Sequence, residues 1–296
     1  MNDMSAKPDL PFFTETGGPR RPRIALMGEF SAGKSTLANL MIGSDPLPVQ
    51  VIATQLPPVW IQFGDGPAVI VDLEGNETPF SVDSLRAGRD EETAYIRIFA
   101  RENILRICDI IDMPGISDPN MSPTVWERVM PLADGVVWCT PATQAWRQSE
   151  AAVWEAVSDE VREHSILLLT RADMLLTPRD KRKVLKRVQT ETHGLFAACI
   201  PISLLLAQEA GDDLDLWDES GAEPFVTTFL RVIGQLKDHL GTDALADGMP
   251  HMQLVAVEPT EVASDLEPET APVVPRRPVA GGKGQRRGHP AQDAES

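Results

Sequence analysis

Residues 28–35 combine glycines, a lysine and a serine at a spacing suited to holding phosphate. They read Gly-Glu-Phe-Ser-Ala-Gly-Lys-Ser and match the pattern G-x-x-x-x-G-K-[ST] at every fixed position. Glycines are needed because such a loop turns its backbone N–H groups inward around phosphate oxygens, where a Cβ would collide. Lys34 would neutralise the β- and γ-phosphates, and the Ser35 hydroxyl would ligate Mg²⁺. The loop therefore predicts a nucleoside triphosphate site.

A second group of residues, Asp112-Met113-Pro114-Gly115, follows the apolar run 107–111. A carboxylate at the end of an inner strand can give Mg²⁺ an oxygen, and the Gly115 N–H can reach a γ-phosphate. Taken alone, the four residues could be an ordinary turn. Their predicted place one strand away from the phosphate loop favours a role at the nucleotide.

A third group, Thr170-Arg171-Ala172-Asp173, follows the apolar run 166–169. The Asp173 carboxylate can accept hydrogen bonds from both N1–H and the exocyclic amine of guanine, whereas adenine presents an acceptor at N1. Each unpaired buried group costs about 1–3 kcal/mol, so one aspartate can discriminate between the two bases. Asp173 could equally cap a following helix. In series with the other two motifs, guanine recognition is favoured.

Short apolar runs alternate with amphipathic stretches, which is typical of an α/β sheet. The predicted strands are 24–27, 59–63, 107–111, 135–139, 166–169 and 197–202, and the predicted helices are 34–41, 148–157, 178–193 and 224–240. Residues 68–84 interrupt the alternation and predict a β-hairpin. The spacing of Trp146, Val153, Trp154 and Val157 predicts one apolar helical face that packs in the core.

Composition limits the classes of protein that remain. The 296 residues carry a net charge of −17, which disfavours a nucleic-acid partner. No apolar run approaches the roughly 18 residues of a membrane span, and the first residues do not resemble a signal peptide. Three separated cysteines, Cys108, Cys139 and Cys199, predict buried free thiols in the cytoplasm. Residues 1–22 and the Pro- and Gly-rich stretch 246–296 are expected to be disordered, leaving one folded domain over 23–245.

These residues resemble the guanine-nucleotide-binding (G) domain of the dynamin family, and most closely that of bacterial dynamin-like proteins. The phosphate loop through Thr36 is similar to the dynamin form, with Ser31 at the family's distinctive serine. The hairpin at 68–84 resembles the family's extra strands, and the segments 133–150 and 216–221 are similar to family segments. The likeness extends over about residues 22–240 and implies a P-loop GTPase fold, with a mostly parallel sheet flanked by helices.

The resemblance implies a role for each matching residue. Ser31, Lys34 and Thr54 would be catalytic, and Ser35, Thr54 and Asp112 would hold Mg²⁺, with Thr54 in the first switch segment. Arg171 stands where the family usually has lysine. The residues expected to contact the nucleotide are Gly28, Glu29, Phe30, Ser31, Ala32, Gly33, Lys34, Ser35, Thr36, Asp112, Gly115, Thr170, Arg171 and Asp173.

Hydrolysis of GTP to GDP and phosphate is the activity that the resemblance implies. Ile116, directly after Gly115, cannot orient a water molecule as glutamine does in small GTPases. In dynamin-like enzymes the serine that Ser31 matches acts with K⁺ when two G domains meet across the nucleotide. We therefore expect slow turnover in isolation and stimulation by a transient homodimer.

No long helical stalk is expected soon after Leu240, which leaves membrane association open and suggests a dynamin-like partner that supplies the stalk. The alternatives are a nucleotide-binding scaffold with little turnover and an ATP-using P-loop enzyme.

Overall fold

The computed structural model describes residues 20–43, 57–81, 93–117 and 124–242. Within them, one mixed sheet has the strand order β4-β3-β5-β2-β6-β1-β7-β8-β9. Its strands are β1 (Arg23–Gly28), β2 (Val59–Phe63), β3 (Val69–Asp72), β4 (Glu77–Pro79), β5 (Thr93–Ala100), β6 (Asp109–Asp112), β7 (Gly135–Pro141), β8 (Ile166–Thr170) and β9 (Ala198–Pro201). The half from β6 to β9 is parallel, and β2 joins it antiparallel to β6.

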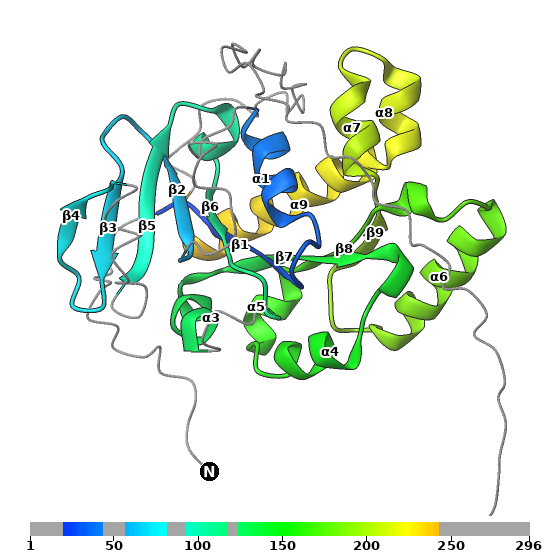
Figure 1. Ribbon diagram of the computed structural model, residues 1–296, viewed down its shortest axis with the longest axis horizontal. Helices are drawn as coiled ribbons and strands as arrows, with labels where there is room; N and C mark the ends of the chain where they lie inside the picture. The colour runs from blue at the N-terminus through cyan, green and yellow to red at the C-terminus, as the bar shows by residue number, and fades with distance from the viewer. Residues whose placement is uncertain (1–19, 44–56, 82–92, 118–123, 243–296) are drawn as a thin grey trace, which may run out of the picture. The chain divides into compact units, whose positions relative to one another are not determined.

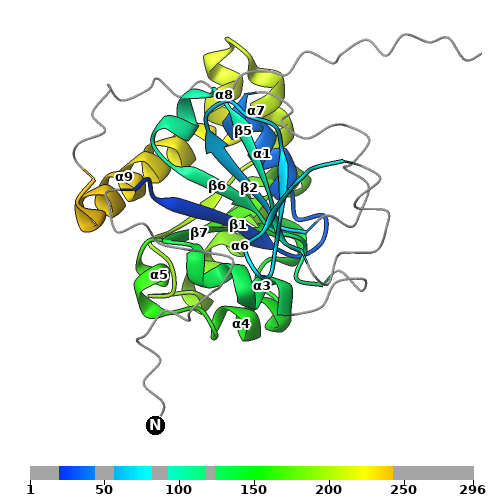
Figure 2. The same ribbon diagram turned by 90° about the vertical axis from the view of Figure 1, so that its left-hand side faces the viewer.

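Helices cover both faces of this sheet, as Figures 1 and 2 show. One face packs against α1 (Lys34–Ile42), α7 (Leu204–Ala210) and α9 (Ala222–Leu240), and the other packs against α3 (Thr124–Val129), α4 (Gln148–Trp154), α5 (Asp159–Glu163) and α6 (Pro178–Glu191). The helix α8 (Leu214–Ser220) lies beside α7. Short 3₁₀ turns complete the described elements: η2 (Asn103–Arg106), η3 (Met130–Leu132), η4 (Ala142–Gln144) and η5 (Ala172–Met174).

The central strand β1 shows why its sequence forms this layered core. All six of its residues are buried, as expected for a strand covered on both faces. Successive side chains point to opposite faces, so Ile24 and Leu26 join the apolar cluster under α1 and α9, while Ala25 and Met27 join the cluster under α4 and α6. A continuous apolar run, rather than an alternating one, is therefore the signal of this strand.

The structure confirms the six predicted strands, with end points shifted by one or two residues, and a hairpin within the predicted range 68–84, of which residues 82–84 lie outside the described part of the chain. In the hairpin, β3 pairs antiparallel with β4. On its other side β3 pairs antiparallel with β5, a strand that was not predicted from the sequence. The strand β5 pairs parallel with β2 and so attaches the hairpin to the main sheet. Its sequence, Thr-Ala-Tyr-Ile-Arg-Ile-Phe-Ala, is rich in β-branched and aromatic residues, which was the available signal.

The four predicted helices are present as α1, α4, α6 and α9, whereas α3, α5, α7 and α8 were not predicted. Core packing of the tryptophan face is confirmed, since Trp146 and Trp154 are buried and their rings pack against Trp138 and Phe196. Trp146 itself lies before α4, in a left-handed backbone conformation. The shared helical face therefore begins only within α4.

The prediction of buried free thiols is confirmed for two of the three cysteines. Cys108 and Cys139 are buried, Cys199 is half-buried, and all three are free thiols. Burial raises the pKa of Cys139 and of Cys199 to about 12, so both thiols stay protonated at neutral pH. No group of three or more His, Cys, Asp or Glu side chains suited to a metal ion occurs in the described part of the chain.

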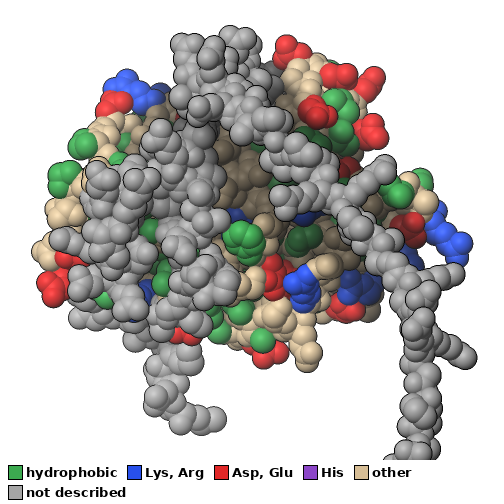
Figure 3. All heavy atoms as spheres, viewed as in Figure 1, with side chains coloured by type: hydrophobic (Ala, Val, Ile, Leu, Met, Phe, Trp, Pro, Cys, Tyr) green, Lys and Arg blue, Asp and Glu red, His purple; other side chains and the backbone are tan. Residues whose placement is uncertain are grey.

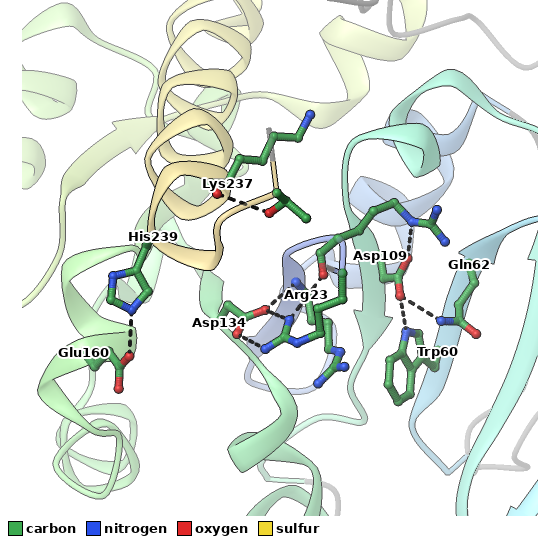
Figure 4. A network of polar contacts seen from close by, with 11 residues as sticks. Arg23, Trp60, Gln62, Asp109, Asp134, Glu160, Lys237 and His239 are labelled. Carbon is green, nitrogen blue, oxygen red and sulfur yellow. Dashed lines mark hydrogen bonds and ion pairs between the residues drawn. The ribbon is translucent and has the colours of Figure 1, made fainter. Parts of the chain in front are cut away.

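A network of hydrogen bonds and ion pairs holds the amino end of the central strands in place (Figure 4). Asp109 accepts hydrogen bonds from Arg21 Nε at 3.0 Å, Trp60 Nε1 at 3.1 Å and Gln62 Nε2 at 2.8 Å. Asp134 accepts from both terminal nitrogens of Arg20, at 2.5 and 2.7 Å. These contacts fix the chain just before β1.

Candidate functional site

The phosphate loop leaves the carboxyl end of β1, where two glycines allow its path. Gly28 has φ 136°, and a Cβ there would lie 2.0 Å from the Cys139 carbonyl oxygen of the neighbouring strand β7. Gly33 has φ 94° and caps α1 without a side-chain hydrogen bond to the helix. Because no side chain caps this helix end, its first N–H groups face the loop, where an anion would bind favourably.

Lys34 and Ser35 begin α1 and lie inside this loop. Lys34 is 7% exposed, and its Nζ donates hydrogen bonds to the carbonyl oxygens of Gly28 at 3.1 Å and Glu29 at 2.8 Å. The Ser35 hydroxyl donates to Asp112 Oδ2 at 2.9 Å. The structure therefore brings the loop lysine, the loop serine and the predicted carboxylate together at one edge of the sheet.

The environment of the Asp112 carboxylate indicates whether this site suits a divalent cation. Its carboxylate is buried, and although Oδ2 accepts from Ser35, Oδ1 has no hydrogen-bond partner among the described residues. A buried carboxylate oxygen without a partner is costly, and a cation beside it would remove that cost. Mg²⁺ is usually held by one or two protein oxygens together with water and substrate phosphates. Ser35 and Asp112 fit that donor set.

Burial also changes the titration of Asp112. It raises the pKa of this carboxyl from 3.8 to about 6, against the opposing effects of the Ser35 hydrogen bond and the Lys34 charge. Between about pH 4 and pH 6, the native state therefore keeps a proton that the unfolded chain has lost. Without metal and nucleotide, Asp112 lowers the free energy of unfolding as the pH rises through this window, by up to about 3 kcal/mol.

We expect Asp112→Asn to stabilise the metal-free, nucleotide-free protein at pH 7.5 and to give no gain at pH 4, where the wild-type carboxyl is already protonated. Urea unfolding at the two pH values measures the difference. Asp238→Asn, at an exposed position on another element, serves as the control. An equal effect of Asp112→Asn at both pH values would contradict the raised pKa.

The segment after Asp112 runs directly beside the phosphate loop. The Ile116 N–H donates to the Gly28 carbonyl at 3.2 Å, and the Phe30 N–H donates to Ser117 Oγ at 3.3 Å. A Cβ on Gly115 would lie 2.8 Å from both Cα and N of Phe30. Only glycine lets this segment approach the phosphate loop so closely.

The Thr170–Asp173 group also contacts the phosphate loop. Thr170 Oγ1 donates to the Ala32 carbonyl at 2.7 Å, and Arg171 Nη2 donates to the Ser31 carbonyl at 2.7 Å. Arg171 and Ser31 both have left-handed backbone conformations, with φ 55° and 58°, which are uncommon for residues with a side chain. The Arg171 head is therefore hydrogen-bonded to the phosphate loop, a contact that was not predicted from the sequence, which gave Arg171 only a contact to the nucleotide.

Asp173 is half-buried within η5, immediately after these contacts. The alternative that it caps the following helix is wrong, because Thr177 is the N-cap of α6 and accepts from the Asp180 N–H. The carboxylate therefore remains available for a ligand on the same edge of the sheet as Lys34. Thr36 is exposed on α1, and Thr54 lies outside the described residues.

Two acidic residues support this edge, a role that was not predicted from the sequence for either of them. Glu29, in the phosphate loop, is 7% exposed and accepts a hydrogen bond from Ser149 Oγ at 2.8 Å. Glu150, fully buried, accepts from Trp138 Nε1 at 2.9 Å, Thr140 Oγ1 at 3.0 Å and the Arg147 N–H at 2.8 Å. Burial raises the pKa of Glu150, and these hydrogen bonds act against that shift.

We expect Glu150→Ala to lower the free energy of unfolding by about 2 kcal/mol or more, because it leaves buried donors without an acceptor. Glu155→Ala, at the exposed end of the same helix, should change stability little. Urea titration of both variants measures the difference. Equal stability of the two variants would contradict a structural role for Glu150.

The sheet, the phosphate loop and the two strand-end motifs together define the class of this domain: it has the P-loop GTPase fold. The sequence profile described as the dynamin family matches residues 24–172, so the chain belongs to the dynamin family and contains a dynamin-type G domain. None of the described helices combines the length and the apolar character needed to cross a membrane.

Individual relatives agree with this family. The chain is 28% identical over 159 residues to Dynamin-like protein 2 of Campylobacter jejuni subsp. jejuni, a match that covers 51% of this chain and 26% of that protein. It is 23% identical over 257 residues to the probable transmembrane GTPase FZO-like of Arabidopsis thaliana, covering 82% and 26%. The chain thus spans about a quarter of the length of these two relatives.

Solved structures show the same fold. A chain from an oligomerised bacterial dynamin pair, described as sensing and tethering membranes over long range, superposes with a TM-score of 0.54 at 18% identity. The superposition covers 75% of this chain and 36% of the other. At this level of identity the likeness concerns the fold alone.

Proposed function

We propose that this chain binds GTP with Mg²⁺ and hydrolyses it to GDP and phosphate. The observation that carries the proposal is the convergence of three separate sequence motifs at one edge of the sheet. The hydrogen bonds from Ser35 to Asp112, Thr170 to Ala32 and Arg171 to Ser31 join these motifs. Membership of the dynamin family supports the same activity.

The proposed roles combine the positions of the described residues with the family resemblance, on which alone the role of Thr54 rests. Lys34 and the loop N–H groups bind the β- and γ-phosphates, and Ser35 and Asp112 hold Mg²⁺, which supplies positive charge to the phosphates. Asp173 accepts hydrogen bonds from guanine. Thr54 completes the proposed Mg²⁺ site. The proposed folded domain spans residues 23–245, and its free, protonated thiols support a cytoplasmic location.

The binding test compares nucleotides directly. Calorimetry with Mg²⁺ present should show tight binding of GTP and weak binding of ATP, and phosphate release from GTP should follow. Equal affinity for both nucleotides would favour the ATP-using alternative. Binding of GTP without phosphate release in a single turnover would favour a scaffold.

The second candidate function is a nucleotide-binding scaffold with little turnover, and the residue that favours it is Ile116. It directly follows Gly115 and is packed beside the phosphate loop through its N–H bond to the Gly28 carbonyl. An aliphatic side chain here cannot orient the attacking water. The isolated domain is therefore expected to turn over slowly, and a faster rate requires a further contribution.

We propose that a second G domain makes this contribution, with Ser31 and K⁺ stabilising charge at the phosphates. Phosphate release per molecule should rise with protein concentration in K⁺ buffer, and it should rise less for Ser31→Ala. A specific activity that does not change with concentration would contradict stimulation by dimerisation. A separate dynamin-like partner supplying a stalk is the proposed larger assembly, since the solved bacterial dynamins are described as an oligomerised pair.

A further inference from the structure

The helix α6 carries a strongly basic outer surface. Six of the chain's 27 Lys and Arg residues lie on its 14 residues, and all six are exposed. Among the described residues, only Arg187 of this set forms an ion pair, with Glu191 at 2.8 Å. We define the basic surface as Arg179, Lys181, Arg182, Lys183, Lys186 and Arg187.

The paired helices α7 and α8 carry the opposite charge. Six acidic side chains are exposed here, and no Lys or Arg occurs anywhere from Leu204 to Ser220. No ion pair involves these carboxylates within the described part of the chain. Acidic side chains gather at the upper right of Figure 3, over α7 and α8, and basic ones at the right, over α6. We define the acidic surface as Glu209, Asp212, Asp213, Asp215, Asp218 and Glu219.

Each charged surface has exposed apolar side chains beside it. Met174 and Leu176 precede the basic helix and are 59% and 90% exposed, and Leu205 and Leu214 lie on α7 and α8 at 57% and 77%. These four are among five large apolar side chains that stand out as exposed in the described residues. Apolar anchors surrounded by charged groups are typical of a protein interface.

We propose that these two surfaces bind a second copy of this chain, with the basic surface of one molecule against the acidic surface of the other. An anionic membrane or nucleic acid would attract the basic surface but repel the acidic one and the net charge of −17. A second copy satisfies both surfaces at once. Both lie toward the right of Figure 1, so a two-fold axis would repeat the same contact in both directions.

The contact does not require GTP hydrolysis, because it uses neither the phosphate loop nor Asp173. It therefore goes beyond the proposed activity and can fail or succeed independently of it. Sedimentation velocity of the full chain without nucleotide should show self-association that rises with protein concentration.

Charge reversal tests the pairing itself. A basic-surface variant (Lys181→Glu, Lys183→Glu, Lys186→Glu) and an acidic-surface variant (Asp212→Lys, Asp215→Lys, Glu219→Lys) should each raise the dissociation constant about 100-fold, because like charges would meet across the contact. An equimolar mixture of the two variants should associate again. Together they carry the same total charge as two wild-type copies, so the overall repulsion between the two molecules changes little.

The control carries the same change in net charge as the basic-surface variant, at exposed positions outside both surfaces: Arg101→Glu, Arg106→Glu and Arg231→Glu. It should still associate, with circular dichroism confirming that every variant is folded. The proposal is overturned if the wild-type chain stays monomeric at all concentrations, if the control loses association equally, or if mixing restores nothing. It is also overturned if a monomeric wild type binds vesicles containing phosphatidylglycerol through the basic surface.

Discussion

Lys34→Ala is expected to lower the affinity for GTP about 1,000-fold in the presence of Mg²⁺. The Lys34 Nζ is buried and already directed into the phosphate loop by the carbonyl oxygens of Gly28 and Glu29. Charge-assisted hydrogen bonds contribute about 1.5–3 kcal/mol each, and contacts to two phosphates together correspond to about three decades of affinity. Calorimetry with GTP and with GDP measures this loss.

The loss should be smaller for GDP than for GTP, because GDP lacks the γ-phosphate that Lys34 is expected to contact. Lys181→Ala, which removes an exposed lysine on α6, is the matched control and should leave both affinities unchanged. The urea unfolding transition of Lys34→Ala without nucleotide checks that the fold is retained. A folded variant with wild-type affinity for GTP would show that the phosphates bind elsewhere.

Asp173→Asn is expected to lower the affinity for GTP about 100-fold and to leave the weak affinity for ATP unchanged. A carboxylate accepts from both the N1–H and the amine of guanine, whereas the asparagine amide turns a donor toward one of them. The lost bond and the unpaired donor each cost about 1–3 kcal/mol. Competition of unlabelled nucleotides against a fluorescent GTP analogue measures both affinities.

Xanthosine triphosphate provides the matched rescue for this variant. Xanthine has a carbonyl oxygen in place of the amine of guanine, so the asparagine NH₂ can donate to it. Asp173→Asn should therefore prefer xanthosine triphosphate over GTP. Loss of all nucleotide binding without this rescue would point to damage of the η5 turn. A wild-type preference for GTP would remove Asp173 from base recognition.

Neighbouring residues along the chain were sufficient to predict much of this domain. The phosphate loop at 28–35 could be recognised because its glycines, lysine and serine act through local backbone geometry. The ends of β6 and β8 could be placed because buried parallel strands are continuous apolar runs, and carboxyl ends of parallel strands meet at one edge. The hairpin could be predicted from its turn residues at 74–77.

Residues with mixed patterns were harder to predict. The strand β5 alternates little on its own and follows residues outside the described part of the chain, so its place between β3 and β2 depends on pairing with both. The helices α7 and α8 are too short to be stable alone, and they are stabilised by packing against each other. Local propensity does not determine such contacts.

The sequence by itself determined the family, the three nucleotide motifs and their order along the chain, because each motif works through residues within one short segment. Only the tertiary structure decided how the motifs are joined. The Arg171 contact to Ser31 links residues 140 positions apart, and the Ser149 contact to Glu29 links residues 120 positions apart. The raised pKa of Asp112 likewise depends on burial by several strands. Such features arise from packing between distant segments, whose positions no local pattern specifies.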